Sequence, residues 1–195
     1  MKAIIVTGTP GTGKTTLARK LGKKLNFSYL DANKTIKKYK LVAGYDKKRK
    51  ANIVDIKKLN RALIKEINNF KGTIKKNTIK RISLAKFNKI KLTNNMKNNN
   101  YIKKGIIIDS HLSHYLPKKY VDLCIVTKCD LKVLEKRLKE KKYDKNKIRE
   151  NLDAEIFDIC LNEAKENGHK IMCIDTTKGI NITSLARKIG GFIGI

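Results

Sequence analysis

Short apolar runs alternate along the chain with segments in which apolar residues recur every three or four positions. The apolar runs have the length of β-strands and cover residues 2–7, 27–31, 105–109, 122–127 and 170–175. Helical spacing is found over residues 15–25, 56–70, 130–138 and 181–189, and in one long segment that includes Ile148, Leu152, Ile156, Ile159 and Cys160. Nearly continuous apolar strands are typical of a sheet that is covered on both faces. This order predicts an α/β fold with a five-stranded, largely parallel sheet and helices on both faces.

Three segments depart from this alternation. Residues 33–55 are polar and are expected to form a helix and turns, and residues 139–150 are expected to be a charged connection. Residues 71–104 contain 11 Lys or Arg residues, seven Asn residues and no acidic residue. Alternating apolar positions within it fit a basic hairpin or a helix. We interpret residues 71–104 as a basic insertion in a single domain that spans residues 1–195.

The connection between the first strand and the first helix carries the strongest chemical signal. Residues 8–16 read GTPGTGKTT and match the phosphate-binding pattern G-x-x-x-x-G-K-S/T at every fixed position. Glycines such as Gly11 and Gly13 let backbone N–H groups curl around phosphate oxygens, and the N-terminus of the following helix favours negative charge. The motif predicts that Lys14 contacts the β- and γ-phosphates of a nucleoside triphosphate and that Thr15 ligates Mg²⁺.

Polar residues also follow two of the later strands. Asp109 ends an apolar strand, where a Walker B carboxylate holds Mg²⁺ directly or through water, opposite Thr15. The alternative is an exposed carboxylate without a function. His111, two residues further on, could place an attacking water or a substrate phosphate, or could be structural. The loop of residues 176–179 is expected to lie near residues 8–16 and to contact the base through its backbone.

The remaining histidines and the cysteines have no such context. We expect His114 and His169 to lie on the surface. The cysteines form no C-x-x-C pair, and they are Cys124, Cys129, Cys160 and Cys173. Buried free thiols are the best interpretation, and a metal site is not expected without histidines at matching spacing.

The formal net charge of +29 is extreme for 195 residues. A basic surface gains affinity for RNA through counterion release, which suggests RNA or a ribosome as partner. The chain is also rich in Asn and Ile and poor in Arg, which fits a general compositional bias, and both interpretations stay open. No run of 18 apolar residues and no secretory signal is present, so we expect a cytoplasmic protein without contact to membranes.

Three patches together give the chain a resemblance to the adenylate kinase isoenzyme 6 family, which includes the coilin-interacting nuclear ATPases and their archaeal relatives. The first patch is residues 7–16. The second is residues 41–46, LVAGYD, followed by residues 53–55, IVD. The third is residues 108–111, IDSH, followed downstream by residues 143–157, in which the pattern N-x-x-x-E-I-F at residues 151–157 matches closely. The resemblance covers most of the chain except residues 71–104.

The resemblance implies a P-loop NTPase fold of the nucleoside monophosphate kinase type. It implies a broad-specificity kinase that converts ATP and AMP to two ADP, with an additional ATPase activity and with Mg²⁺ as cofactor. The family is also linked to maturation of the small ribosomal subunit through binding of small-subunit ribosomal protein eleven, which makes that protein and pre-ribosomal RNA implied partners.

Site residues are carried over by position. Residues 31–54 would bind the monophosphate and residues 140–150 would form a short lid. The implied ATP-binding residues are Gly11, Gly13, Lys14, Thr15, Thr16 and Lys141. The implied catalytic residues are Lys14, Asp109 and His111, with Thr15 and Asp109 at the Mg²⁺. The implied monophosphate-binding residues are Lys37, Gly44 and Tyr45.

The chain departs from the family at two cations. Lys141 and Lys37 stand where the family usually has arginines, and lysine keeps the charge but loses the bidentate geometry of a guanidinium. We therefore expect ATP binding with weak monophosphate kinase turnover. Two other functions stay open: an ATPase assembly factor with negligible kinase activity, and a small-metabolite kinase of the same fold, such as a shikimate kinase.

Overall fold

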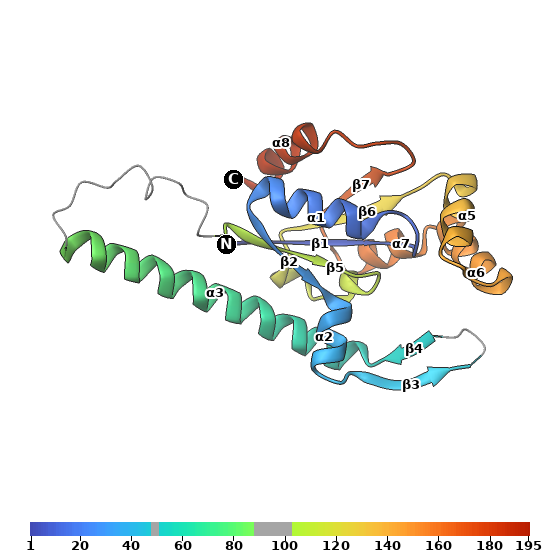
Figure 1. Ribbon diagram of the computed structural model, residues 1–195, viewed down its shortest axis with the longest axis horizontal. Coiled ribbons are helices and arrows are strands. Elements are labelled where there is room, and N and C mark those ends of the chain that lie inside the picture. The colour runs from blue at the N-terminus through green and yellow to red at the C-terminus, as the bar shows by residue number, and fades with distance from the viewer. Residues whose placement is uncertain (48–50, 88–102) are drawn as a thin grey trace.

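A parallel five-stranded sheet forms the centre of the molecule (Figure 1). The computed structural model describes residues 1–47, 51–87 and 103–195, with the backbone alone described for residues 75–87. The strand order is β2-β5-β1-β6-β7. The strands are β1 (Lys2–Gly8), β2 (Phe27–Asp31), β5 (Gly105–Asp109), β6 (Leu123–Lys128) and β7 (Ile171–Asp175). The predicted α/β class and the five-stranded parallel sheet are confirmed.

Helices cover both faces of this sheet, because successive side chains of a strand point to opposite sides. Ile4 and Val6 of β1 pack in one core with α1 (Lys14–Leu25) and α8 (Ile182–Ile193). Ala3 and Ile5 pack in the other with α2 (Ala32–Lys38), α3 (Ile56–Phe87) and α7 (Ile159–Glu166). Both cores consist mainly of aliphatic side chains, and burial of each such side chain contributes about 1.5–3 kcal/mol relative to exposure.

Two helices form an arm at the carboxyl end of β6. They are α5 (Leu131–Glu140) and α6 (Lys145–Ile156), and they share a small apolar cluster with Leu134, Leu138 and Ile148. Asp130 caps α5 as predicted, because its carboxylate accepts hydrogen bonds from the N–H groups of Lys132 and Val133 at 3.0 and 3.1 Å. The expectation that residues 139–150 are only a connection is wrong, since α6 starts at Lys145.

The structure corrects the expected single long helix in this part of the chain. It is divided into α6 and α7 at Phe157 and Asp158, and Asp158 has a left-handed backbone conformation with φ 54°. Ile156 and Ile159 flank this break and are 54% and 42% exposed, so they do not face the core as expected. The helical periodicity continued across the break, which explains the error.

The polar segment before α3 contains more regular structure than expected. After α2, the strands β3 (Val42–Asp46) and β4 (Ala51–Val54) pair as an antiparallel two-stranded sheet. Helix α3 then runs for 32 residues, well past the predicted end at residue 70. Residues 71–87 of the supposed insertion thus continue α3, in agreement with the helical alternative, while residues 88–102 lie outside the described residues.

The connection between β5 and β6 carries two short 3₁₀ helices, η2 (Ser113–Tyr115) and η3 (Lys118–Tyr120). Within residues 1–47, 51–87 and 103–195, no helix combines the length and the apolar character that a membrane span requires.

Candidate active site

The phosphate loop follows β1 and requires its glycines for steric reasons. Gly8, Gly11 and Gly13 have φ angles of 135°, 96° and 82°, which favour glycine. A Cβ on Gly8 would lie 2.5 Å from Thr127 Oγ1, and a Cβ on Gly11 would lie 2.8 Å from Leu134 Cδ1. The chain can therefore turn tightly between β1 and α1, and α1 begins at Lys14 with its N-terminus at the carboxyl edge of the sheet.

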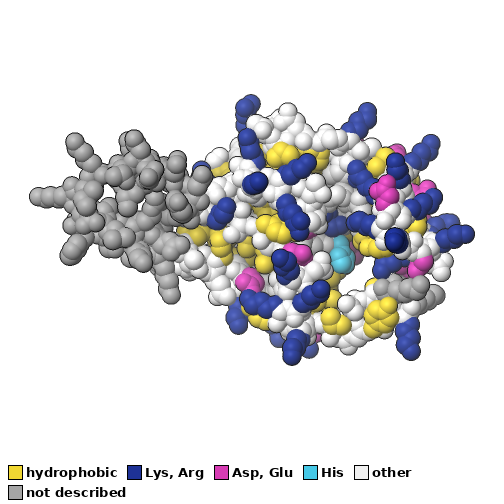
Figure 2. Space-filling model, viewed as in Figure 1, with side chains coloured by type: hydrophobic (Ala, Val, Ile, Leu, Met, Phe, Trp, Pro, Cys, Tyr) yellow, Lys and Arg dark blue, Asp and Glu magenta, His cyan; other side chains and the backbone are white. Residues whose placement is uncertain are grey.

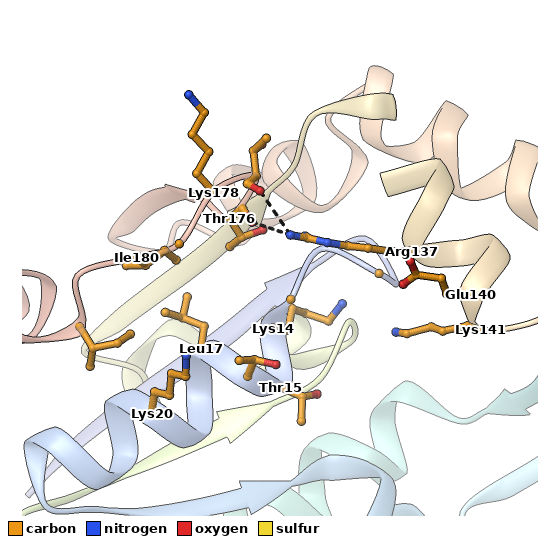
Figure 3. A pocket seen from close by; sticks show the side chains of 16 residues that line it. Lys14, Thr15, Leu17, Lys20, Arg137, Glu140, Lys141, Thr176, Lys178 and Ile180 are labelled. Atoms are coloured by element: carbon orange, nitrogen blue, oxygen red, sulfur yellow. Dashed lines mark hydrogen bonds between the residues drawn. The ribbon is translucent and has the colours of Figure 1, made fainter. Parts of the chain in front are cut away.

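The loop borders a cavity of about 540 Å³ (Figure 3). The predicted ATP-binding residues all line it, namely Gly11, Gly13, Lys14, Thr15, Thr16 and Lys141. The predicted loop of residues 176–179 lines it as well, together with Leu17, Lys20, Arg137, Glu140, Ile180 and Ile182. Its lining thus combines the N-terminus of α1, the end of α5 and the loop after β7, which lie far apart in the sequence.

Five basic residues line this cavity, namely Lys14, Lys20, Arg137, Lys141 and Lys178. The side chains of Lys14 and Lys141 point toward one another (Figure 3). Burial lowers the pKa of Lys14 to about 8; Cys160 and Asp109 counteract this, while Lys141 lowers it further. The Lys14 ammonium donates to the carbonyl oxygen of Thr9 at 2.9 Å. An anion between Lys14 and Lys141 would relieve the repulsion between them.

Arg137 is a residue of the cavity that the sequence analysis missed. Its Nη2 donates to the carbonyl oxygen of Thr176 at 2.8 Å, and its Nη1 contacts Cys129 Sγ at 3.2 Å. Arg137 precedes Lys141 by four residues at the end of a helix, so both side chains lie on one side of α5. The four-residue spacing of Arg137 and Lys141, in the helix that Asp130 caps, was the signal for Arg137 that the sequence offered.

Asp109 lies at the same edge of the sheet, as predicted for the last residue of β5. Its carboxylate is buried, and Oδ2 accepts a hydrogen bond from the Tyr29 hydroxyl at 2.9 Å. Asp109 contributes to the electrostatic environment of Lys14 but is not among the residues that line the cavity. No cluster of three or more His, Cys, Asp or Glu residues suited to a metal is present among the described residues.

His111 lies beyond Asp109 and is exposed. The surrounding protein and the positive charges of Lys14 and His114 lower the pKa of His111 to about 4. Its imidazole is therefore neutral at pH 7 and can accept or donate a hydrogen bond. His111 stays a prediction as a water-positioning residue, with a protonation state that suits this role.

The expectation that His114 lies on the surface is wrong. His114 is 1% exposed, and its Nδ1 lies 2.7 Å from Thr7 Oγ1 while Nε2 lies 2.8 Å from Glu163 Oε2. Burial lowers its pKa, and the negative charge of Glu163 opposes this shift. His114 thus connects β1, which leads into the phosphate loop, to α7. His169 is half-buried and contacts the carbonyl oxygen of His114 at 2.8 Å.

The cysteines are free, as expected, but not all are buried. Cys124 and Cys129 are buried, whereas Cys160 is half-buried and Cys173 is exposed on β7, which is an edge strand. The side chains of an edge strand are less covered than those of the central strands, which explains the exception.

The predicted monophosphate-binding residues lie outside the lining of the cavity. Lys37 is exposed in the last turn of α2, and Gly44 and Tyr45 belong to β3, where Tyr45 is 58% exposed. All three lie on the segment between β2 and α3, and none of them lines the cavity with Lys14.

Comparison with known proteins gives the family. Residues 4–158 match the family described as AAA domain. The chain is 32% identical over 174 residues to the protein named "Putative adenylate kinase" of Methanocaldococcus jannaschii, covering 89% of this chain and 76% of that protein. It is 28% identical over 164 residues to "Adenylate kinase isoenzyme 6 homolog" of Dictyostelium discoideum, covering 84% of this chain and 74% of that protein.

A solved structure supports the fold. The unliganded crystal structure of a sugar kinase from Janibacter sp. superimposes with a TM-score of 0.56 and 12% identity, over all of this chain and 95% of that one. At this identity the likeness concerns the fold alone. The sequence matches show that the chain belongs to the AAA domain family and to the adenylate kinase isoenzyme 6 family.

Proposed function

We propose that this protein is a nucleoside monophosphate kinase that transfers the γ-phosphoryl group of ATP to AMP and forms two ADP. The observation that carries the proposal is the cavity at the phosphate loop, which is lined by Lys14, Arg137 and Lys141. Phosphoryl transfer depends on positioned positive charge around the transferred group more than on covalent chemistry. The names of the relatives support AMP as acceptor.

On this proposal Lys14 and Lys141 have separate roles. The loop N–H groups and Lys14 hold the β- and γ-phosphates, while Lys141 neutralises charge that develops during transfer. The chain fits a Mg²⁺ ion that is held mainly by phosphate and water, because Asp109 and Thr15 offer two oxygen ligands and Asp109 keeps one carboxylate oxygen beside the bond to Tyr29. Bound Mg²⁺ supplies charge neutralisation and orientation of the phosphates.

The acceptor is proposed to bind at residues 31–54, with Lys37, Gly44 and Tyr45 as contacts. Figure 1 shows α2 and the β3–β4 hairpin on the same side of the sheet as α3. Because Lys37 and Lys141 are lysines, contacts to phosphate are single rather than bidentate. Weak turnover with AMP is therefore expected, together with slow ATP hydrolysis in which His111 orients the water.

The test is ADP production from ATP and Mg²⁺, with and without AMP, for the wild type, His111→Ala and Lys14→Met. ADP formation that rises above the rate with ATP alone when AMP is added, even with a low kcat, supports the kinase, and Lys14→Met controls for contaminating activity. Hydrolysis that ignores AMP and is lost in His111→Ala would overturn the kinase in favour of an ATPase. Stimulation by shikimate but not by AMP would favour a small-metabolite kinase.

A second candidate function is ATP-dependent assembly of the small ribosomal subunit, with ribosomal protein eleven and pre-ribosomal RNA as partners. Its support is an uneven distribution of charge. Residues 32–104 contain 23 of the 46 Lys and Arg residues but 3 of the 17 acidic residues. Residues 105–195, by comparison, contain 17 Lys and Arg residues and 13 acidic residues. Figure 2 shows basic side chains over much of one face of the molecule.

Helix α3 displays this asymmetry most clearly. Leu59 and Leu63 are buried against the sheet, whereas Lys57, Arg61 and Lys65 are exposed. The test is RNA binding at several salt concentrations by a variant with Lys57→Gln, Arg61→Gln and Lys65→Gln. A matched control neutralises Lys165, Lys170 and Lys188, outside residues 32–104. A weaker salt dependence in the first variant alone supports the candidate, and equal effects of both variants would contradict it.

A further inference from the structure

A buried carboxylate joins the phosphate loop to the arm that carries Arg137 and Lys141. Glu155 lies in the last turn of α6 and is 5% exposed. Its Oε2 accepts a hydrogen bond from Thr9 Oγ1 at 2.6 Å, across 146 residues of sequence. Thr9 is the second residue of the phosphate loop and is 1% exposed. The bond is therefore shielded from water, where a charge-assisted hydrogen bond is strong.

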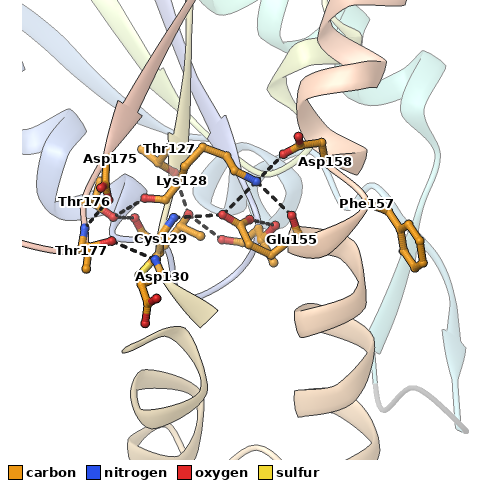
Figure 4. A network of polar contacts seen from close by, with 12 residues as sticks. Thr127, Lys128, Cys129, Asp130, Glu155, Phe157, Asp158, Asp175, Thr176 and Thr177 are labelled. Atoms are coloured by element: carbon orange, nitrogen blue, oxygen red, sulfur yellow. Dashed lines mark hydrogen bonds and ion pairs between the residues drawn. The ribbon is translucent and has the colours of Figure 1, made fainter. Parts of the chain in front are cut away.

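The other oxygen of Glu155 is bound from β6 (Figure 4). Its Oε1 accepts from the N–H of Cys129 at 2.9 Å and lies 3.2 Å from Lys128 Nζ. The Lys128 ammonium also donates to the Glu155 carbonyl oxygen at 2.9 Å and pairs with Asp158. A carboxylate in this position has only donors around it, which compensates the cost of its burial. An amide would direct its NH₂ group at one of these donors.

Thr9 connects this bond to the phosphate-binding lysine. The Thr9 carbonyl oxygen accepts from Lys14 Nζ at 2.9 Å, from Thr12 Oγ1 at 2.8 Å and from the N–H of Thr12 at 3.2 Å. The side chain of Thr9 is thus held by Glu155 while its backbone holds Lys14. Displacement of Thr9 changes the loop and the resting position of the lysine together.

We propose that Glu155 is a positioning residue that sets the phosphate loop, through Thr9, at the distance from Arg137 and Lys141 that ATP requires. Helix α6 packs on α5, which carries Arg137 and leads into Lys141. Glu155 therefore fixes the base of this arm and the loop to the same point. Misplacement of about 1 Å between groups that act on one phosphate chain can cost about 100-fold in rate. The proposal rests on the ATP-dependent function proposed above.

The test compares ATP binding and steady-state kinetics of Thr9→Val, Thr9→Ser and Glu155→Gln. Thr9→Val keeps the shape of the side chain but removes the donor, and we expect the Kd for ATP and the KM for ATP to rise about tenfold. The KM for AMP should stay within about twofold in the same variant, because the described partners of the Glu155 carboxylate are Thr9, Cys129 and Lys128, which lie outside residues 31–47 and 51–54. Thr9→Ser retains the hydroxyl and should restore ATP binding. Glu155→Gln should resemble Thr9→Val.

A matched control separates positioning from general stability. The Asp122 carboxylate accepts from the N–H of Ala3 at 2.7 Å and so holds β1 at its other end. Asp122→Asn should lower Tm to a similar degree and leave ATP binding unchanged. Wild-type ATP affinity in both Thr9→Val and Glu155→Gln would overturn the proposal, and so would an equal loss of ATP affinity in Asp122→Asn. If the wild type binds ATP but ignores AMP, the kinase function fails while the binding comparison still decides the role of Glu155.

Discussion

The Tyr29 hydroxyl donates to Asp109 Oδ2 at 2.9 Å and so connects β2 to the last residue of β5. Burial, followed by this hydrogen bond, raises the pKa of Tyr29 to about 12. The phenol therefore stays protonated at neutral pH and orients the carboxylate that is proposed to meet Mg²⁺. The Arg19 guanidinium lies 5.2 Å from the ring centroid on one side, which helps to keep the ring in place.

Removal of this hydroxyl should affect Mg²⁺-dependent activity more than the stability of the fold. In Tyr29→Phe we expect about a threefold to tenfold loss of kcat and a higher Mg²⁺ concentration at half-maximal rate, because one hydrogen bond to the carboxylate is lost. Asp109→Asn should lose about 100-fold or more. The measurement is a Mg²⁺ titration of ADP formation. Tyr39→Phe is the control, since Tyr39 donates to Glu66 at 3.0 Å on α3, and an equal effect there would refute the specific role of Tyr29.

ATP binding should depend on pH through Lys14. The pKa of Lys14 in the free protein is lowered to about 8, and bound phosphates favour the charged amine. ATP binding should therefore take up protons above about pH 8, and the Kd for ATP should rise as the pH increases from 8 to 10. Calorimetry in buffers of different ionisation enthalpy measures the proton uptake. Lys14→Met should bind ATP weakly and show no such uptake; persistence of the uptake in that variant would assign it to another group.

The lowered pKa of Lys14 also makes the stability of the folded protein depend on pH. The folded protein gives up this proton near pH 8, whereas the unfolded chain keeps it to about pH 10.5. The unfolded state thus binds more protons between these values, and Lys14 makes the free energy of unfolding rise with pH there. A comparison of wild type and Lys14→Met in urea at pH 8 and pH 10 measures this contribution.

His111 should stay neutral through the physiological range. Its pKa is lowered to about 4, against 6.5 for an unperturbed histidine. Protonation of His111 should therefore not lower the rate of ATP hydrolysis between pH 8 and pH 5.5. The imidazole ¹³C or ¹⁵N shifts measure its titration directly, with His169→Ala as an aid to assignment. A midpoint near pH 6.5 in the nucleotide-free protein would contradict the proposed environment.

The same shift affects stability at acidic pH. Because the unfolded chain binds a proton near pH 6.5 and the folded chain only near pH 4, the contribution of His111 to stability is lost as the pH falls between these values. His111→Ala should reduce this pH dependence.

An arginine in place of Lys141 should increase the rate of phosphoryl transfer. Lys141 lines the cavity with Arg137 one helical turn before it. A guanidinium at position 141 could bind two phosphate oxygens, so we expect Lys141→Arg to raise kcat with AMP severalfold and Lys141→Ala to lower it by about 10-fold to 100-fold. Kinetics at saturating ATP measure both. Lys139→Arg, on the same helix and paired with Glu135 at 2.6 Å, is the control. An unchanged rate in Lys141→Ala would exclude a role in transfer.

The sequence alone predicted the sheet, the phosphate loop and the place of Asp109, because these depend on local patterns. Runs such as Ile106 to Ile108 are apolar on both faces and must be central strands. Gly11 and Gly13 mark a turn that other residues cannot adopt, and a carboxylate that ends a parallel strand must lie at the ligand-binding edge. The order of these elements then restricts the topology.

Other features depend on contacts between distant segments. His114 looked like a surface residue, yet Thr7 and Glu163 enclose it from two other elements. The break at Asp158 and the length of α3 were likewise invisible, because a helical pattern does not show where tertiary packing ends a helix.

The hydrogen bond between Thr9 and Glu155 shows most clearly what the sequence determined and what only the tertiary structure decided. The sequence determined that Thr9 belongs to a phosphate loop and that Glu155 lies in a patch resembling the family. Only the tertiary structure decided that they meet, 146 residues apart, and that their hydrogen bond joins the loop to the arm of α5 and α6. The physical reason is that a buried carboxylate must find donors wherever the packed helices place it, and no local pattern encodes that choice.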